Sequence, residues 1–358
     1  MRYIKHWQSC FFILLFIYGC KSATDSNNSA YIEKFPITIF CGDKDTLPIS
    51  VLDPTGIILS DSLLCLTFQS KSAKYALEAF RRKDYKHIVG LLTKGRGPNE
   101  ITNLRRINQW DISEGKMNLL IRSYPYFMAW LDVNRSVDSN KAIFTKEFDF
   151  TTDYEMKVRI AESSFIFDLN NNKLIIARST NSLTESDNPN PYFVNFDLNK
   201  RVVTDSIFMQ NFVRTNNFNS LVYDITTAIS PDLQNFITSN SSLNSIDFYD
   251  LTKKTKKTIK LSKEAGDYTK AVSKMRTYLG GASSTKDYFF VLSYPEYSSS
   301  IGINTIIYTF KQDGSPLIEF SFKEKLRYYF VDQNSGEIFA IDTDEKIWRY
   351  KLNKDVFS

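Results

Sequence analysis

The chain has 358 residues, with 45 Lys and Arg against 40 Asp and Glu, only two His, and a formal net charge of +5. A dedicated nucleic-acid-binding protein carries a larger and more clustered excess of positive charge, so we expect no nucleic-acid partner. Apolar residues at 42% and charged residues at 24% are ordinary for a folded globular chain and exclude wholesale disorder. The aromatic fraction of 15% favours strands over helices.

The N-terminus has the pattern of an export signal. Arg2 and Lys5 precede an unbroken apolar run at residues 11–18, which is too short for a transmembrane helix. The run ends in Ile17-Tyr18-Gly19-Cys20, which resembles a bacterial lipobox, the signal in which the Cys is diacylated and becomes the new N-terminus. We therefore expect residues 1–19 to be a lipoprotein signal peptide and Cys20 to carry lipid.

Two alternatives concern this end of the chain. An ordinary signal peptide would be cut near Ser22 or Ala23 instead. In either case residues 20–30 are small and polar, which predicts a flexible tether ahead of a folded domain at residues 31–358. With the lipid, the membrane becomes a partner through the anchor. We expect an outer-membrane lipoprotein that faces the periplasm rather than the cell surface.

The cysteines leave one question open. Cys10 is removed with the signal and Cys20 is the lipidation candidate, so Cys41 and Cys65 remain in an oxidising compartment. Both lie in strand-like stretches. They either bridge neighbouring strands as a disulfide or stay separate as two buried thiols. The chain has no CxxC motif and no Cys/His cluster, so we expect no zinc site and no cofactor.

After residue 30 the chain is a series of short apolar runs separated by turn residues. A first kind of turn precedes an apolar strand, as at residues 230–235, 284–287 and 332–337. A second kind, with an Asp, follows an aromatic strand, as at residues 249–253. The pattern repeats every 45–64 residues, which is typical of four-stranded propeller blades.

The repeat therefore predicts an all-β chain, a six-bladed β-propeller, with a pair of β-sandwiches as the competing architecture. Propellers close by joining an N-terminal strand to the last blade, and residues 31–40 are the candidate, beside residues 338–350. Helical patterns are short, at residues 262–266 and part of 268–275. Gly280-Gly281 is interpreted as a plain turn.

One motif stands out at residues 94–100. Its glycines indicate a tight turn, with either positive φ or a close backbone approach. The interpretation as a turn between blades competes with one in which the arginine faces the central channel and meets an anionic group. The arginine and the glutamate are also placed to pair across the turn. The motif residues are Lys94, Gly95, Arg96, Gly97, Pro98, Asn99 and Glu100.

The motif and the signal together resemble the TolB-like six-bladed β-propeller lipoproteins. Members start with a lipoprotein signal, carry a GRGPxE turn after the first full blade, and continue in degenerate blades. Residues 95–100 match this turn, and Ile101 stands where a Phe often follows. The resemblance covers residues 31–352 and implies a propeller anchored in the envelope. It implies no particular activity.

Catalytic patterns are missing from the sequence. His87 is the one histidine left after the signal, and it is expected on a strand surface; no GxSxG, P-loop or GxGxxG motif is present. We expect a binding or scaffold module for a protein or glycan partner rather than an enzyme. The alternative is a hydrolase or lyase with a metal and carboxylates at the channel mouth.

Overall fold

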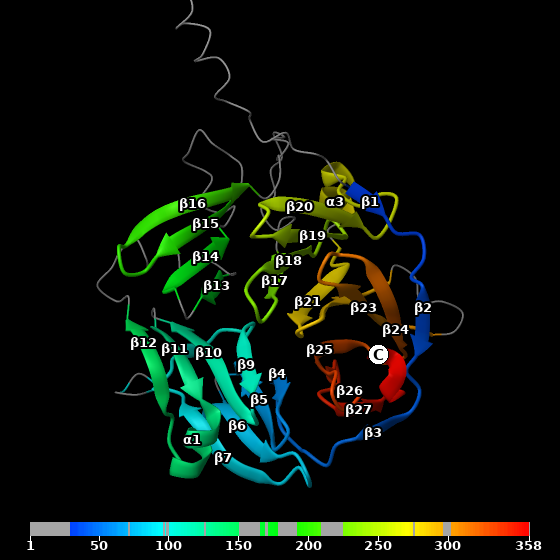
Figure 1. Ribbon diagram of the computed structural model, residues 1–358. Coiled ribbons are helices and arrows are strands. Elements are labelled where there is room, and N and C mark those ends of the chain that lie inside the picture. Colours follow the sequence, from blue (N-terminus) through cyan, green and yellow to red (C-terminus); the bar gives the residue numbers. More distant parts are fainter. Residues whose placement is uncertain are drawn as a thin grey trace, which may run out of the picture.

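Six small β-sheets form a ring in the computed structural model of the protein (Figure 1). The structure describes residues 29–70, 72–95, 97, 100–124, 127–149, 165–168, 171–177, 192–208, 225–274, 276–295 and 302–357. Each sheet is one blade, and the blades follow one another along the chain. The prediction of an all-β, six-bladed propeller is therefore confirmed, and the sandwich alternative is wrong.

Each blade is an antiparallel meander whose first strand lies innermost. Blade 1 contains β4 (Pro54–Leu59), β5 (Leu63–Phe68), β6 (Tyr75–Arg81) and β7 (His87–Thr93). Blade 2 contains β8 (Asn103–Leu104) and β9 (Trp110–Ser113), which both pair with β10 (Lys116–Tyr124), followed by β11 (Phe127–Asp132) and β12 (Phe144–Asp149). Blade 3 contains β13 (Phe165–Asp168), β14 (Lys173–Ala177), β15 (Tyr192–Asp197) and β16 (Val202–Phe208).

The second half of the ring repeats this order. Blade 4 contains β17 (Ile225–Ile229), β18 (Asn235–Asn240), β19 (Ser245–Asp250) and β20 (Thr255–Lys260). Blade 5 contains β21 (Leu279–Ser284), β22 (Tyr288–Ser293), β23 (Thr305–Lys311) and β24 (Pro316–Phe322). Blade 6 has only three consecutive strands, β25 (Leu326–Asp332), β26 (Glu337–Asp342) and β27 (Ile347–Lys351), so its fourth strand comes from elsewhere.

An N-terminal strand closes the ring, as predicted, but it is a different segment. The fourth strand of blade 6 is β3 (Lys44–Thr46), which runs antiparallel to β27 with Asp45 opposite Arg349. Residues 31–40, the segment expected in this place, do not pair with blade 6. The physical reason is that this segment pairs instead with the outer edges of blades 4 and 5, which removes their unpaired backbone groups from solvent.

The segment before β3 adds one parallel strand to each of two outer edges. β1 (Ser29–Tyr31) pairs with β20 of blade 4, and β2 (Ile37–Phe40) pairs with β24 of blade 5. In Figure 1 the blue N-terminal chain runs along the outside of blades 4, 5 and 6. β1 begins at Ser29, the first residue that the structure describes, so the expected boundary between tether and domain at residue 31 stays a prediction.

The core lies between adjacent blades, because each strand sends alternate side chains to opposite faces. β10 illustrates this. Leu119 and Ile121 are fully buried in the cluster shared with blade 1, whereas Leu120 packs in the cluster shared with blade 3. The sheets therefore read as almost continuous apolar runs, buried on both faces, which explains the shortness of the alternating patterns in the sequence.

Helices are few and short. α3 (Tyr268–Lys274) follows blade 4 and confirms the predicted helix there, whereas residues 262–266 form turns. α1 (Val133–Ser139) was not predicted; it links β11 to β12 and is capped at its N-terminus by Asp132, whose side chain accepts the Arg135 N–H at 3.0 Å. A single turn of 3-10 helix, η3 (Lys354–Phe357), ends the fold. Within the described ranges, no helix has the length and apolar character needed to cross a membrane.

Candidate functional site

The inner strands of all six blades end at the same end of the ring. There each strand turns back into the second strand of its blade, and these are the turns of the first kind that the sequence repeat indicated. A cavity of about 610 Å³ lies among them, and every blade contributes to its wall. One lining residue from each blade, in chain order, is Asp61, Asp111, Phe167, Ser230, Lys286 and Asn334.

Aromatic rings form the inner part of this channel cavity. Trp110 of β9 is half-buried and lies 5.8 Å, centroid to centroid, from Phe330 of β25. Trp130 and Phe167 are buried and lie 6.5 Å apart, and Phe290 completes the set. Rings of this kind offer large apolar faces to a ligand. Because Trp110 is the ring with an accessible face, it is the aromatic residue best placed to contact one.

Side chains bond across neighbouring inner strands and fix the cavity wall. The amide of Gln109 donates to the Phe167 carbonyl at 2.7 Å and accepts the Phe167 N–H at 2.8 Å, which joins blades 2 and 3. The buried Tyr329 hydroxyl donates to the Phe290 carbonyl at 2.8 Å and joins blades 6 and 5. Burial raises the pKa of Tyr329, so this hydroxyl keeps its proton. The wall is therefore preformed.

The rim of the channel cavity carries polar groups with no internal partner. The side chains of Asp61, Asp111, Ser113, Lys286 and Asn334 are exposed, and none of them bonds to another side chain or to backbone in the described part of the chain. They combine hydrogen-bond donors and acceptors around one opening. Such a mixture, above an aromatic wall, suits a ligand that has both apolar faces and hydrogen-bonding groups.

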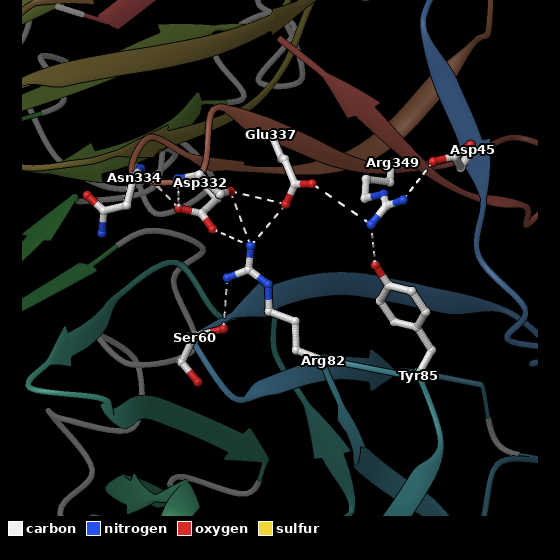
Figure 2. A network of polar contacts seen from close by, with 9 residues as sticks. Asp45, Ser60, Arg82, Tyr85, Asp332, Asn334, Glu337 and Arg349 are labelled. Carbon is white, nitrogen blue, oxygen red and sulfur yellow. Dashed lines mark hydrogen bonds and ion pairs between the residues drawn. The ribbon is translucent and has the colours of Figure 1, made fainter. Parts of the chain in front are cut away.

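Asp332 also lines the cavity, but its carboxylate is fully engaged (Figure 2). Arg82, in the turn after β6, lies 2.6 Å from Asp332 and 3.0 Å from Glu337, and donates to the Ser60 carbonyl at 3.1 Å. These side chains are 12–19% exposed. The arginine therefore neutralises two carboxylates of blade 6 from blade 1, and its role is to hold the first and last blades together.

A second arginine extends the same junction. Arg349 of β27 donates to Asp45 of β3 at 2.7 Å and to the Tyr85 hydroxyl at 3.2 Å, and lies 3.9 Å from Glu337 (Figure 2). The hydrogen bond from Arg349 lowers the pKa of Asp45. The seam between blades 6 and 1 is thus held by charged hydrogen bonds as well as by the β3–β27 ladder.

The predicted turn at residues 94–100 is partly described. The Glu100 carboxylate accepts the Gly97 N–H at 2.7 Å, and the Glu100 N–H donates to the Gly97 carbonyl at 3.1 Å, so the turn is closed on itself. A Cβ on Gly95 would lie 1.8 Å from the Glu100 carboxylate, which explains this glycine by close approach. Arg96 and Pro98 lie outside the described residues, so the expected pairing of Arg96 is not tested.

The two cysteines are separate thiols, so the disulfide alternative is wrong. Cys65 is fully buried in the cluster between blades 1 and 2, with its Sγ 3.7 Å from the Met117 sulfur. Cys41 follows β2 and packs in the cluster between blades 5 and 6. Burial raises the pKa of each thiol to about 12. Cys20 lies outside the described residues.

The described residues form no metal-binding cluster, at the cavity or elsewhere. They contain no cluster of three or more His, Cys, Asp or Glu side chains able to hold a metal ion. His87 is exposed on β7, the outer strand of blade 1, beside Glu78 at 3.8 Å, as expected for a strand-surface residue. The cavity residues themselves were not predicted individually. Their signal was the repeated turn, whose equivalent positions in successive blades necessarily gather at one end of a ring.

No protein-family profile matches the chain, and no curated protein is similar enough to count as a relative. Solved structures with a similar fold include a luciferin-regenerating enzyme, with a TM-score of 0.44, 10% identity, and 87% of this chain and 92% of that chain covered. The WD40 repeats of RRP9 match with a TM-score of 0.46 and 8% identity, over 89% of this chain and 99% of that chain. A member of the duf4221 family from Bacteroides vulgatus matches with a TM-score of 0.49 and 10% identity, over 87% of this chain and 99% of that chain. Likenesses this distant say nothing about function.

Proposed function

We propose that the protein is a lipid-anchored propeller of the bacterial envelope that binds a protein or glycan partner through its channel cavity. The observation that carries the proposal is the cavity itself. Its volume of about 610 Å³ lies within the range of small-molecule sites, and all six blades line it. An accessible Trp110 face and a rim of unengaged polar side chains supply the two kinds of contact that such a partner needs.

The position of the N-terminus supports the anchor. Ser29, the first described residue, begins a strand on the outer edge of blade 4, nine positions after Cys20. A chain attached there leaves both ends of the channel open to a partner. The lipobox-like Ile17-Tyr18-Gly19-Cys20 and the GRGPxE turn support kinship with the TolB-like lipoproteins. We propose the outer membrane, on its periplasmic side, as the location.

The anchor is tested by metabolic labelling with a clickable palmitate analogue in a bacterial host. The wild-type protein should take up the label and partition with membranes. Cys20→Ser should lose the label and be released as a soluble protein. Cys10→Ser, a substitution inside the same signal, should keep the label and serves as the matched control. Labelling that persists in Cys20→Ser would contradict the anchor.

Binding at the cavity is tested with arrays of envelope glycans and of peptides. The full-length protein in detergent should bind at least one ligand, and Asp111→Asn should weaken that binding about tenfold, because a charged hydrogen bond is lost. Asp138→Asn, on the exposed end of α1, is the matched control and should bind like the wild type. Equal binding by both variants would show that the partner binds outside the cavity and would contradict the proposal.

A further inference from the structure

A group of arginines and tyrosines occupies the opposite end of the channel, where the inner strands begin. Arg106 lies ahead of β9 in blade 2, and Arg327 is the second residue of β25 in blade 6. Both guanidinium groups lie over the ring of Tyr328, with their Cζ atoms 5.6 Å and 5.4 Å from its centroid. Two cations from different blades therefore meet on one half-buried tyrosine.

The Arg106 side chain extends across the channel to blade 5, where its guanidinium group lies against the backbone of Gly281. A Cβ on Gly281 would lie 1.8 Å from Nη2 of Arg106 and 2.6 Å from its Cζ. Gly281 was interpreted as part of a plain turn, but it lies inside the inner strand β21. Only a residue without a side chain lets a guanidinium rest against the backbone at this position.

A buried arginine fixes the backbone that carries Arg106. Arg122 of β10 is 5% exposed, and its Nη2 donates to the Arg106 carbonyl at 3.2 Å. Its own carbonyl accepts the Arg105 N–H at 2.9 Å. Burial lowers the pKa of Arg122 to about 10, and the nearby charge of Arg105 adds to this effect. The two hydrogen bonds fix the backbone of residues 105 and 106, and the guanidinium group of Arg122 lies close to that of Arg105.

These cations differ from the other well-placed arginines of the fold. Arg82 and Arg349 each meet carboxylates at 2.6–3.0 Å. In contrast, Arg105, Arg106 and Arg327 form no ion pair with any residue of the described ranges. Gathering positive charge without counter-charge is unfavourable, and it attracts anions from solution. The planar guanidinium fork matches carboxylate and phosphate oxygens in particular.

We propose that this end of the channel binds a ligand through a carboxylate or phosphate group held by Arg106 and Arg327, with Arg105 at its edge. The site is separate from the channel cavity, which lies at the other end of the ring and has a carboxylate-bearing rim. A partner bound at one end of the channel leaves the other end accessible.

The test is isothermal titration calorimetry on the full-length protein in detergent. The ligands are pyrophosphate and digalacturonate, and the uncharged methyl ester of digalacturonate is the control. We expect one or both anions to bind and the ester not to bind. Arg327→Gln and Arg106→Gln should each weaken anion binding at least tenfold, the effect of losing one charged hydrogen-bonding group. The anion that binds more tightly identifies the group.

Gly281→Ala separates position from charge. It keeps every arginine but displaces Arg106 from its seat, so it should weaken anion binding about as much as Arg106→Gln. Arg135→Gln, which removes an exposed arginine on α1, is the matched control and should bind anions like the wild type. If Arg106→Gln fails to fold, Arg327→Gln still decides. Absent anion binding, equal binding of the ester, or unchanged affinity in Arg327→Gln overturns the proposal.

Discussion

Replacing Arg82 by Gln should open the seam between blades 6 and 1. The substitution leaves the Asp332 and Glu337 carboxylates facing each other without the cation that now lies 2.6 Å and 3.0 Å from them. Removing one partner of a buried ion pair costs about 3–5 kcal/mol. Because the three side chains keep 12–19% of their surface exposed, water relieves part of this cost, and we expect a loss of about 3 kcal/mol.

The measurement is urea unfolding at 25 °C, together with the thermal midpoint. An unfolding entropy of about 2 cal/mol/K per residue, over a domain of this length, converts the loss into a fall in Tm of about 4–5 °C. Adding Glu337→Gln should recover part of the stability by removing one of the two facing charges. The recovery measures the repulsion directly.

The neighbouring residue provides the control. Arg81 also pairs with a carboxylate, Asp84 at 3.3 Å, but its side chain is 57% exposed. Arg81→Gln should therefore cost less than about 1 kcal/mol. If Arg82→Gln and Arg81→Gln lower the free energy of unfolding by the same amount, the seam does not depend on Arg82 and the reasoning is wrong.

Three further predictions concern buried groups. Cys41 and Cys65 should both resist maleimide at pH 8 in the folded protein, because burial raises the pKa of each thiol to about 12, and both should react in urea without a reductant. If neither thiol reacts in urea until a reductant is added, the two are joined as a disulfide. In chemical unfolding, Trp348→Phe should lower the free energy of unfolding by about 2 kcal/mol more than Trp130→Phe does. The Trp348 indole N–H donates to the Asp342 carboxylate at 2.7 Å, whereas the buried Trp130 N–H has no acceptor among the described residues. Burial raises the pKa of Asp247, so the folded state holds this proton more tightly than the unfolded chain and stability falls as pH rises above the ordinary carboxyl range. Asp247→Asn should therefore gain stability relative to the wild type between pH 4 and pH 7, and a constant difference would contradict the assignment.

The fold was predictable because its signals are local. Each hairpin is indicated by a turn between two apolar strands, such as the turn at residues 332–337. The spacing of these turns along the chain predicts six blades. The N-terminal segment was harder. Its apolar pattern at residues 31–40 says that a strand forms, but not which outer edge it covers, and it divides between blades 4 and 5. Edge choice depends on contacts far apart in sequence.

The sites were less predictable, for the same reason. The turns that line the channel cavity were recognised, but their meeting at one end follows only from ring closure. The contact between Arg106 and Gly281 joins blade 2 to blade 5, and no local sequence pattern indicates it. Without knowledge of the arginine that lies against it, a pair of glycines is interpreted as a turn. The motif at residues 95–100 was conspicuous in the sequence, yet in its described part it is a self-contained turn.

The pairing of β3 with β27 also sets an order of events during synthesis. Lys44 lies opposite Tyr350, so about 300 residues must be made after β3 before its partner exists. At about 5–20 residues per second this takes roughly 15–60 s. Throughout that time β3 has no strand to pair with, and the ring stays open however well blades 1 to 5 have formed. The completed molecule is therefore reached in one late step, and a chain that lacks β27 never reaches it.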